Sequence, residues 1–185
     1  MATGDLTTLA GVKLFLGIQN DADDALLSSL ISQISFAISN YTNRNLLSQS
    51  YVERYDGNSS SILMLRQHPI TAVSALAING AAVSASPDGI AAGYAFDGNY
   101  VFLTKAIFPK GIQNVQISYT AGYASVPFDV AEAVTELVAD RYRVRGRLGE
   151  SSKSMAQGGS TSYDMSYMSD KVKGSLSNYR RMIPI

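Results

Sequence analysis

Hydrophobic residues near both ends of the chain recur at helical spacing. Leucine and valine repeat every three or four positions from Leu6 to Leu16, which is the period of one face of an α-helix. The same period returns in a longer stretch opened by aspartates, in a stretch that starts at Pro127, and in a short stretch that Ser169 can cap. The pattern therefore predicts four helices, near 6–17, 21–44, 127–146 and 169–181.

The middle of the chain changes to the short alternating runs that are typical of strands. YVERYDGNSSSILML is interpreted as two strands across a Gly/Asn/Ser turn. Asn79-Gly80 is the dipeptide favoured in a two-residue hairpin turn, and Asp97, Gly98 and Asn99 mark a second hairpin. We expect a small antiparallel sheet or barrel between about residues 50 and 122.

Together these elements predict an α+β fold. It is expected to be mostly a helical bundle with an inserted small antiparallel β domain. Residues 1–49 and 123–185 would form the helical core with a C-terminal arm, and residues 50–122 would form the insertion.

Charge is balanced overall but not along the chain. The chain has fifteen basic and fifteen acidic residues. This balance disfavours a protein that binds DNA tightly and without sequence specificity through its phosphates. Residues 1–100 carry four basic and eight acidic side chains, whereas residues 101–185 carry eleven and seven. Such an asymmetry suits head-to-tail contacts between copies, because these need two different, complementary patches.

Enzyme, metal and membrane signals are missing from the sequence. The chain has no cysteine and no nucleotide-binding or hydrolase motif, so no catalytic residue, metal or cofactor is expected. The single histidine, His68, is interpreted as structural. An EF-hand loop opened by Asp21 would place Leu26 at its glycine position and Ser32 at its glutamate, so the aspartates are interpreted as favourable helix-end charge. Neither a signal peptide nor a membrane span is expected.

The predicted third helix carries a charged stripe, which makes it the first candidate site. Its acidic side chains lie three or four positions apart, and basic ones extend the same face. Charges that complement the helix dipole are one interpretation, and contact with neighbouring subunits is the other. A DNA-binding or regulatory module built on the arginines is the alternative function. The candidate contact residues are Asp129, Glu132, Glu136, Asp140, Arg141, Arg143, Arg145 and Arg147.

The stretch from Glu150 to Ser169 is the second candidate site. It has too few periodic apolar residues to fold alone, yet its methionines and tyrosines offer adaptable apolar contacts. A docking arm and a passive loop both fit this composition. The candidate docking residues are Met155, Tyr163, Met165, Tyr167 and Met168.

Three stretches, read in order, carry a resemblance that covers nearly the whole chain. They are LTTLAGVKLFLGIQNDADDALLSSLISQISFAISNYTNRN, then LRQHPITAVSALAINGAAV, then VQISYTAGYASVPFDVAEAVTELVADRYRVRGRLGESS. They resemble the head-to-tail connector (adaptor, head-completion) proteins of tailed bacteriophages, in the form with an inserted β domain.

The resemblance implies a structural virion protein, made in the host cytoplasm and placed at the head-to-tail interface. It would form a homo-oligomeric ring, of about twelve copies, between the portal protein and a downstream head-completion or tail protein. The ring would extend the DNA channel, with transient non-specific DNA passage, and would provide a platform for tail attachment. No enzyme activity, cofactor or membrane contact is implied.

Overall fold

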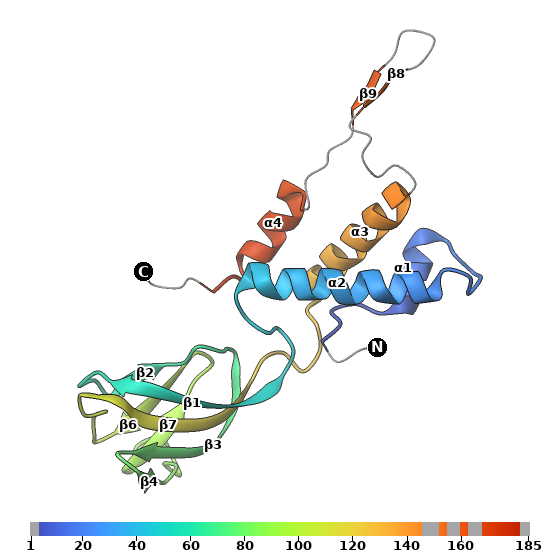
Figure 1. Ribbon diagram of the computed structural model, residues 1–185. Helices are drawn as coiled ribbons and strands as arrows, with labels where there is room; N and C mark the ends of the chain where they lie inside the picture. Colours follow the sequence, from blue (N-terminus) through green and yellow to red (C-terminus); the bar gives the residue numbers. More distant parts are fainter. Residues whose placement is uncertain (1–3, 146–151, 155–159, 163–167, 182–185) are drawn as a thin grey trace. The chain divides into compact units, whose positions relative to one another are not determined.

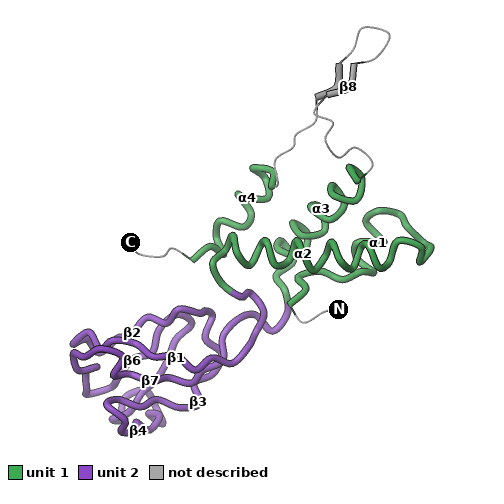
Figure 2. The backbone as a smooth tube through the Cα atoms, viewed as in Figure 1, with its two compact units in different colours: residues 1–44, 126–185 green, residues 45–125 purple. Residues whose placement is uncertain are grey.

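The computed structural model describes residues 4–145, 152–154, 160–162 and 168–181 (Figure 1). The chain divides into two compact units (Figure 2). Residues 1–44 and 126–185 form the helical unit, and residues 45–125 form the β unit.

The described residues of the helical unit contain four α-helices, with bounds α1 Leu9–Leu16, α2 Asp24–Thr42, α3 Phe128–Val144 and α4 Asp170–Ser177. Local chemistry sets several of their ends. The Thr8 hydroxyl accepts a hydrogen bond from the Gly11 N–H at 2.9 Å and caps α1, which ends where Gly17 adopts a left-handed φ of 73°. Ser169 caps α4 in the same way through the Val172 N–H.

Apolar stripes of α2 and α3 form the core of the helical unit. The two helices pack against each other, and α1 and α4 pack on α3. The segment before α1 is tied down by polar contacts: the Leu6 N–H donates to Ser35 Oγ at 2.9 Å, and the hydroxyls of Thr7 and Thr135 lie 2.8 Å apart. The buried core residues include Leu6, Val12, Leu27, Ile31, Ile34, Ile38, Val130, Val134, Leu137, Val138, Val172 and Leu176.

The β unit contains two antiparallel sheets. One has the order β1-β7-β3-β4 and the other the order β2-β6-β5. Their bounds are β1 Gln49–Gly57, β2 Ile62–Met64, β3 Ile70–Ile78, β4 Ala81–Val83, β5 Gly93–Phe96, β6 Tyr100–Thr104 and β7 Gly111–Ala121. Side chains from both sheets share one core, which includes Leu63, Leu76, Val101, Phe108, Val115 and Ile117.

A half-buried carboxylate, that of Glu53, is the centre of a polar cluster in the β unit. Tyr55 and Tyr119 both donate hydrogen bonds from their hydroxyls to Glu53 Oε2, the latter at 2.7 Å. The hydroxyls in turn accept from backbone N–H groups of the next turn, Tyr55 from Arg66 at 2.8 Å and Tyr119 from Gln67 at 3.3 Å. The cluster thus connects β1 and β7 to the loop that leads into β3.

Two of the predicted turns are confirmed and one strand pairing is not. Asn79 and Gly80, with φ of 51° and 83°, join β3 to β4 as a two-residue hairpin, and residues 97–99 join β5 to β6. The run around Gly57 does hold two strands, but they do not pair with each other: β1 pairs with β7, and β2 pairs with β6. The chain changes sheets at this corner, where Asn58 Nδ2 donates to the Ile62 carbonyl.

The expectation of a mostly helical bundle is wrong. The structure is 34% helix and 30% strand, so the β structure is about as extensive as the helical structure and is not a small insertion. One reason is that α1 and α4 are eight residues each, shorter than the stretches predicted near 6–17 and 169–181. The other is that β1, β3 and β7 are long, at nine, nine and eleven residues. A further antiparallel pair, β8 Ser152–Ser154 with β9 Ser160–Ser162, lies in the stretch where no regular structure was predicted.

Candidate functional site

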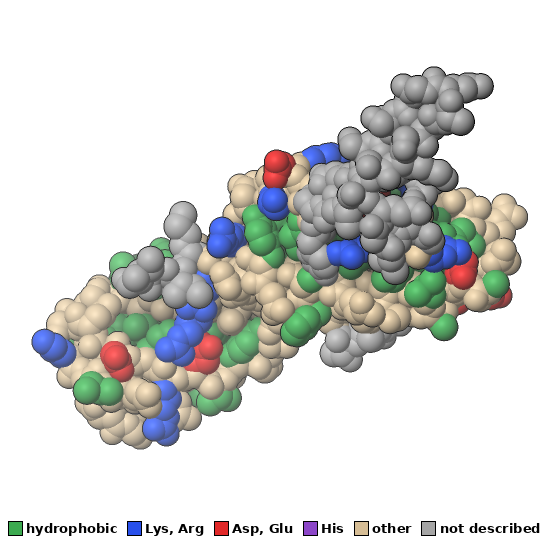
Figure 3. Space-filling model, turned by 45° about the horizontal axis from the view of Figure 1, so that its top comes forward, with side chains coloured by type: hydrophobic (Ala, Val, Ile, Leu, Met, Phe, Trp, Pro, Cys, Tyr) green, Lys and Arg blue, Asp and Glu red, His purple; other side chains and the backbone are tan. Residues whose placement is uncertain are grey.

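The charged stripe lies on α3, opposite the helix face that enters the core. Val130, Val134 and Leu137 are buried, whereas Glu132 and Asp140 are exposed. The opposite charges at the two ends of the helix, with Asp129 in the first turn and Arg141 and Arg143 in the last, complement its dipole. On the face shown in Figure 3, Lys and Arg side chains occur in scattered groups.

Part of the acidic stripe holds α4 within the same chain. The Tyr179 hydroxyl donates to both carboxylate oxygens of Asp129, at 2.8 and 2.9 Å. Lys171 Nζ lies 2.6 Å from Glu136 Oε1, and this contact raises the pKa of Lys171. Asp129 and Glu136 therefore have a role inside the helical unit, which sequence spacing did not reveal because α4 lies far away in the chain.

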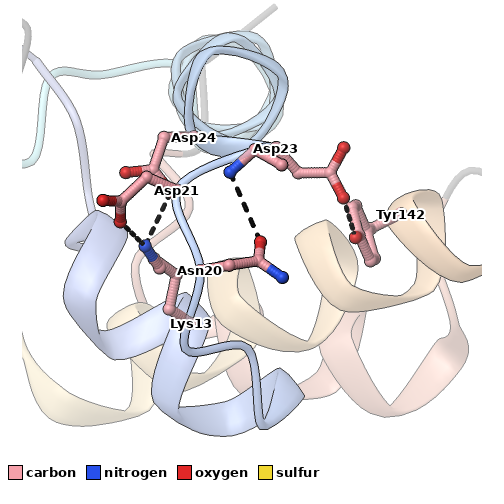
Figure 4. A network of polar contacts seen from close by, with 7 residues as sticks. Lys13, Asn20, Asp21, Asp23, Asp24 and Tyr142 are labelled. Atoms are coloured by element: carbon pink, nitrogen blue, oxygen red, sulfur yellow. Dashed lines mark hydrogen bonds and ion pairs between the residues drawn. The ribbon is translucent and has the colours of Figure 1, made fainter.

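Arg145 is also engaged within the unit. Its guanidinium lies over the Tyr142 ring, 3.7 Å from the centroid, and its Nη2 is 3.4 Å from Asp23 Oδ2. The Tyr142 hydroxyl donates to the same carboxylate oxygen (Figure 4). The last turn of α3 is thereby joined to the start of α2. Arg141 and Arg143 are exposed, and Arg147 lies outside the described residues.

The remaining aspartates before α2 bind a lysine from α1. Lys13 Nζ lies 2.7 Å from Asp21 Oδ1 and 2.8 Å from Asp24 Oδ1 (Figure 4). The hydrogen bonds that the Lys13 ammonium donates to the two carboxylates raise the pKa of Lys13, and the same contact lowers the pKa of Asp21. The acidic cluster is thus a joint between α1, α2 and α3 and does more than offset the helix dipole. Sequence analysis missed Lys13 and Tyr142, which belong to other helices.

The predicted docking stretch is described only in part. Met168 is described and is 7% exposed, so it is buried within its own helical unit. Met155, Tyr163, Met165 and Tyr167 lie outside the described residues. The contact of these residues, and of all eight charged candidates from Asp129 to Arg147, with subunits or a portal stays a prediction.

An apolar groove between α1 and α3 was not found from the sequence. Its volume is about 400 Å³, and Leu14, Phe15 and Phe128 line it together with Gly11, Ala131, Glu132 and Thr135. Leu14 is 84% exposed and Phe128 is 94% exposed. Their spacing indicates helices, but it does not show that the two helices present these side chains to solvent side by side.

Within the described ranges, no group of three or more His, Cys, Asp or Glu side chains is arranged to hold a metal ion. The described helices include none that combines the length and the hydrophobicity of a membrane span. His68 is half-buried and precedes Pro69 in a cis peptide bond.

Comparison with known proteins places this arrangement in a family. A sequence model of the head completion protein family matches residues 5–182. The chain belongs to the head completion protein family. The resemblance seen in the sequence is therefore confirmed, and this head completion protein is a structural virion protein and not an enzyme. No curated protein matches the chain significantly.

Solved structures share the fold of this head completion protein. The neck of an empty gene transfer agent (GTA) particle, computed with C6 symmetry, contains a chain with 23% identity and a TM-score of 0.60. The neck of the native particle, computed with C12 symmetry, contains one with 21% identity and a TM-score of 0.61. In both cases the match covers 100% of this chain and 94% of the other. The virion of the native GTA particle gives the same identity and score as the native neck.

Proposed function

We propose that this head completion protein forms a symmetric ring at the head-to-tail interface of a virion, between the portal protein and the first tail-side component. The observation that carries the proposal is the likeness over the whole chain, both units included, to proteins of GTA necks computed with C6 and C12 symmetry. A protein in such a ring would extend the DNA channel and provide a platform for tail attachment. We further propose that residues 1–49 and 123–185, which include the helical unit, form the ring core, and that residues 50–122 are an insertion.

The charge distribution supports a conduit for DNA over a DNA-binding module. The chain has zero formal net charge, and DNA that slides through a channel should not meet strong phosphate binding. Arg143 is two positions from both Arg141 and Arg145, so its side chain points to a different side of the helix and the three arginines do not form one basic face. Arg145 is also held by Asp23. The structure therefore favours the ring.

The experiment that tests the proposal is co-sedimentation with the portal ring encoded in the same genome. The full chain should sediment with the portal in a fixed stoichiometry. Deletion of residues 150–167, which keeps the buried Met168 and the α4 cap Ser169, should abolish this if the stretch is a docking arm. Reversal of the exposed Arg143 to Glu should weaken the association, whereas Arg54→Glu on the β unit serves as the control. A chain that fails to join the portal but is retained on non-specific DNA at physiological salt would refute the ring.

A further inference from the structure

The outward face of α2 is unusual for a helix at a protein surface. No Asp, Glu, Lys or Arg occurs from Ala25 to Asn43, although a surface helix normally carries charged residues opposite its buried stripe. The buried positions Leu27, Ile31, Ile34 and Ile38 contact the rest of the helical unit. The opposite side presents Leu26, Ser29, Gln33, Phe36 and Asn40, all of them exposed.

Phe36 projects from the middle of this uncharged face. Its side chain is 68% exposed. Ser29 and Gln33, two turns and one turn earlier, hydrogen bond to each other at 2.9 Å. A face that lacks charged residues and exposes an aromatic ring has the composition found at the centre of protein interfaces. We call Leu26, Ser29, Gln33, Phe36 and Asn40 the α2 face.

The groove between α1 and α3 is a second, separate apolar surface on the same unit. No residue of α2 lines it, and the α2 face points away from the α1 and α3 side chains against which α2 packs. One surface is convex and the other is concave. A heterologous contact, in which a patch on one copy meets a different patch on the next, needs two such surfaces.

Charges beside the two surfaces have opposite signs. The exposed Glu132 lines the groove. The exposed Arg180 lies at the C-terminal end of α2, with its guanidinium 5.4 Å from the centroid of the Tyr41 ring. A copy that places its α2 face on the groove of another can therefore bring a basic side chain to an acidic one at the edge of an uncharged contact.

From these observations we infer that the occupant of the groove is a second copy of this chain. The α2 face of one copy packs on the α1–α3 groove of the next, with Phe36 inserted between Phe128 and Leu14 and with Arg180 near Glu132. The inference rests on the proposed ring and names the side chains that would join its subunits.

Chemical cross-linking can test the contact cleanly because the natural chain contains no cysteine. A variant with both Gln33→Cys and Ala131→Cys, co-expressed with the portal and treated with a short bismaleimide, should give a ladder of covalent oligomers beyond the dimer. Either cysteine alone should give no ladder, because one cysteine per copy cannot join more than two chains. Gln33→Cys combined with Val52→Cys on the β unit is the matched control, and it should not form the ladder.

Two sets of substitutions test the energetics. Phe36→Ser should weaken self-association about 30-fold, the loss expected for a central aromatic residue. Val52→Ser, which also removes an exposed apolar side chain, should leave self-association unchanged. Glu132→Arg and Arg180→Glu should each reduce assembly, and the double variant should recover it.

The outcomes separate this contact from the proposed function. Copies that join the portal in fixed stoichiometry without a ladder, with Phe36→Ser assembling normally, would overturn the contact and leave the ring in place. Cross-links from the groove to the portal protein would overturn it in the same way. Failure of the full chain to join the portal at all would overturn the ring, and the contact with it.

Discussion

Replacement of Tyr119 by Phe tests whether the carboxylate cluster of the β unit contributes to stability. The change removes one hydroxyl and keeps the ring, which is 1% exposed. Three contacts are lost: the 2.7 Å bond donated to Glu53, the 3.3 Å bond accepted from the Gln67 N–H, and the weak 3.5 Å contact with the Tyr55 hydroxyl. The ring contact with Tyr51, at 5.5 Å between centroids, remains, so the loss reports on the hydroxyl alone.

The expected cost is about 2–3 kcal/mol. A hydrogen bond to a charged group contributes about 1.5–3 kcal/mol, and an N–H left without its partner adds to the loss. Gln67 is only half-buried, so water can replace part of its bond and the estimate stays at the lower end of the sum. For a domain of the size of the β unit, residues 45–125, this loss corresponds to a fall in Tm of roughly 10–20 °C.

Differential scanning calorimetry of the full chain, with urea unfolding followed by far-UV circular dichroism, measures the loss. Tyr51→Phe is the matched control, since its hydroxyl has only a 3.5 Å contact with Asn45 Nδ2 at the exposed surface. The control should change the free energy of unfolding by less than about 0.5 kcal/mol. Equal stability of Tyr119→Phe and the natural chain would show that the cluster is incidental to the fold.

Three further predictions concern the same two units. Burial raises the pKa of Tyr55 to about 12 and also raises the pKa of Tyr119. Both hydroxyls therefore ionise at lower pH in the unfolded chain than in the folded one, so the free energy of unfolding should fall as pH rises from about 10 to about 12. Tyr55→Phe should make this fall smaller in a pH series of urea unfolding. Gly57→Ala should cost about 3 kcal/mol or more in thermal unfolding, because a Cβ there would lie 1.8 Å from the Pro109 carbonyl oxygen, whereas Gly98→Ala, with nothing within 4 Å, should be neutral. Tyr179→Phe should lower stability by about 0.5–1 kcal/mol and increase hydrogen exchange in α4, and unchanged exchange would show that Asp129 does not hold this helix.

Sequence patterns located those elements whose cause is local. A helical period and a capping hydroxyl act within a few residues, so the stretches that became α1, α2, α3 and α4 could be recognised, although α1 began later and α4 ended earlier than expected. The hairpin at Asn79-Gly80 depends on the left-handed φ that these two residues accept, and it was found for the same reason.

Tertiary structure alone decided which elements meet. β1 and β2 follow each other across a turn, yet β1 pairs with β7, which lies more than fifty residues later. The pairing is set by which strands can bury their apolar side chains in the core that the two sheets share, and not by closeness in sequence. Packing between distant segments likewise decides what the charged stripe of α3 contacts. Spacing placed Asp129 and Glu136 on one face, but only the packing of α4 showed that Tyr179 and Lys171 bind them. Periodicity identifies a face, and the fold decides what covers it.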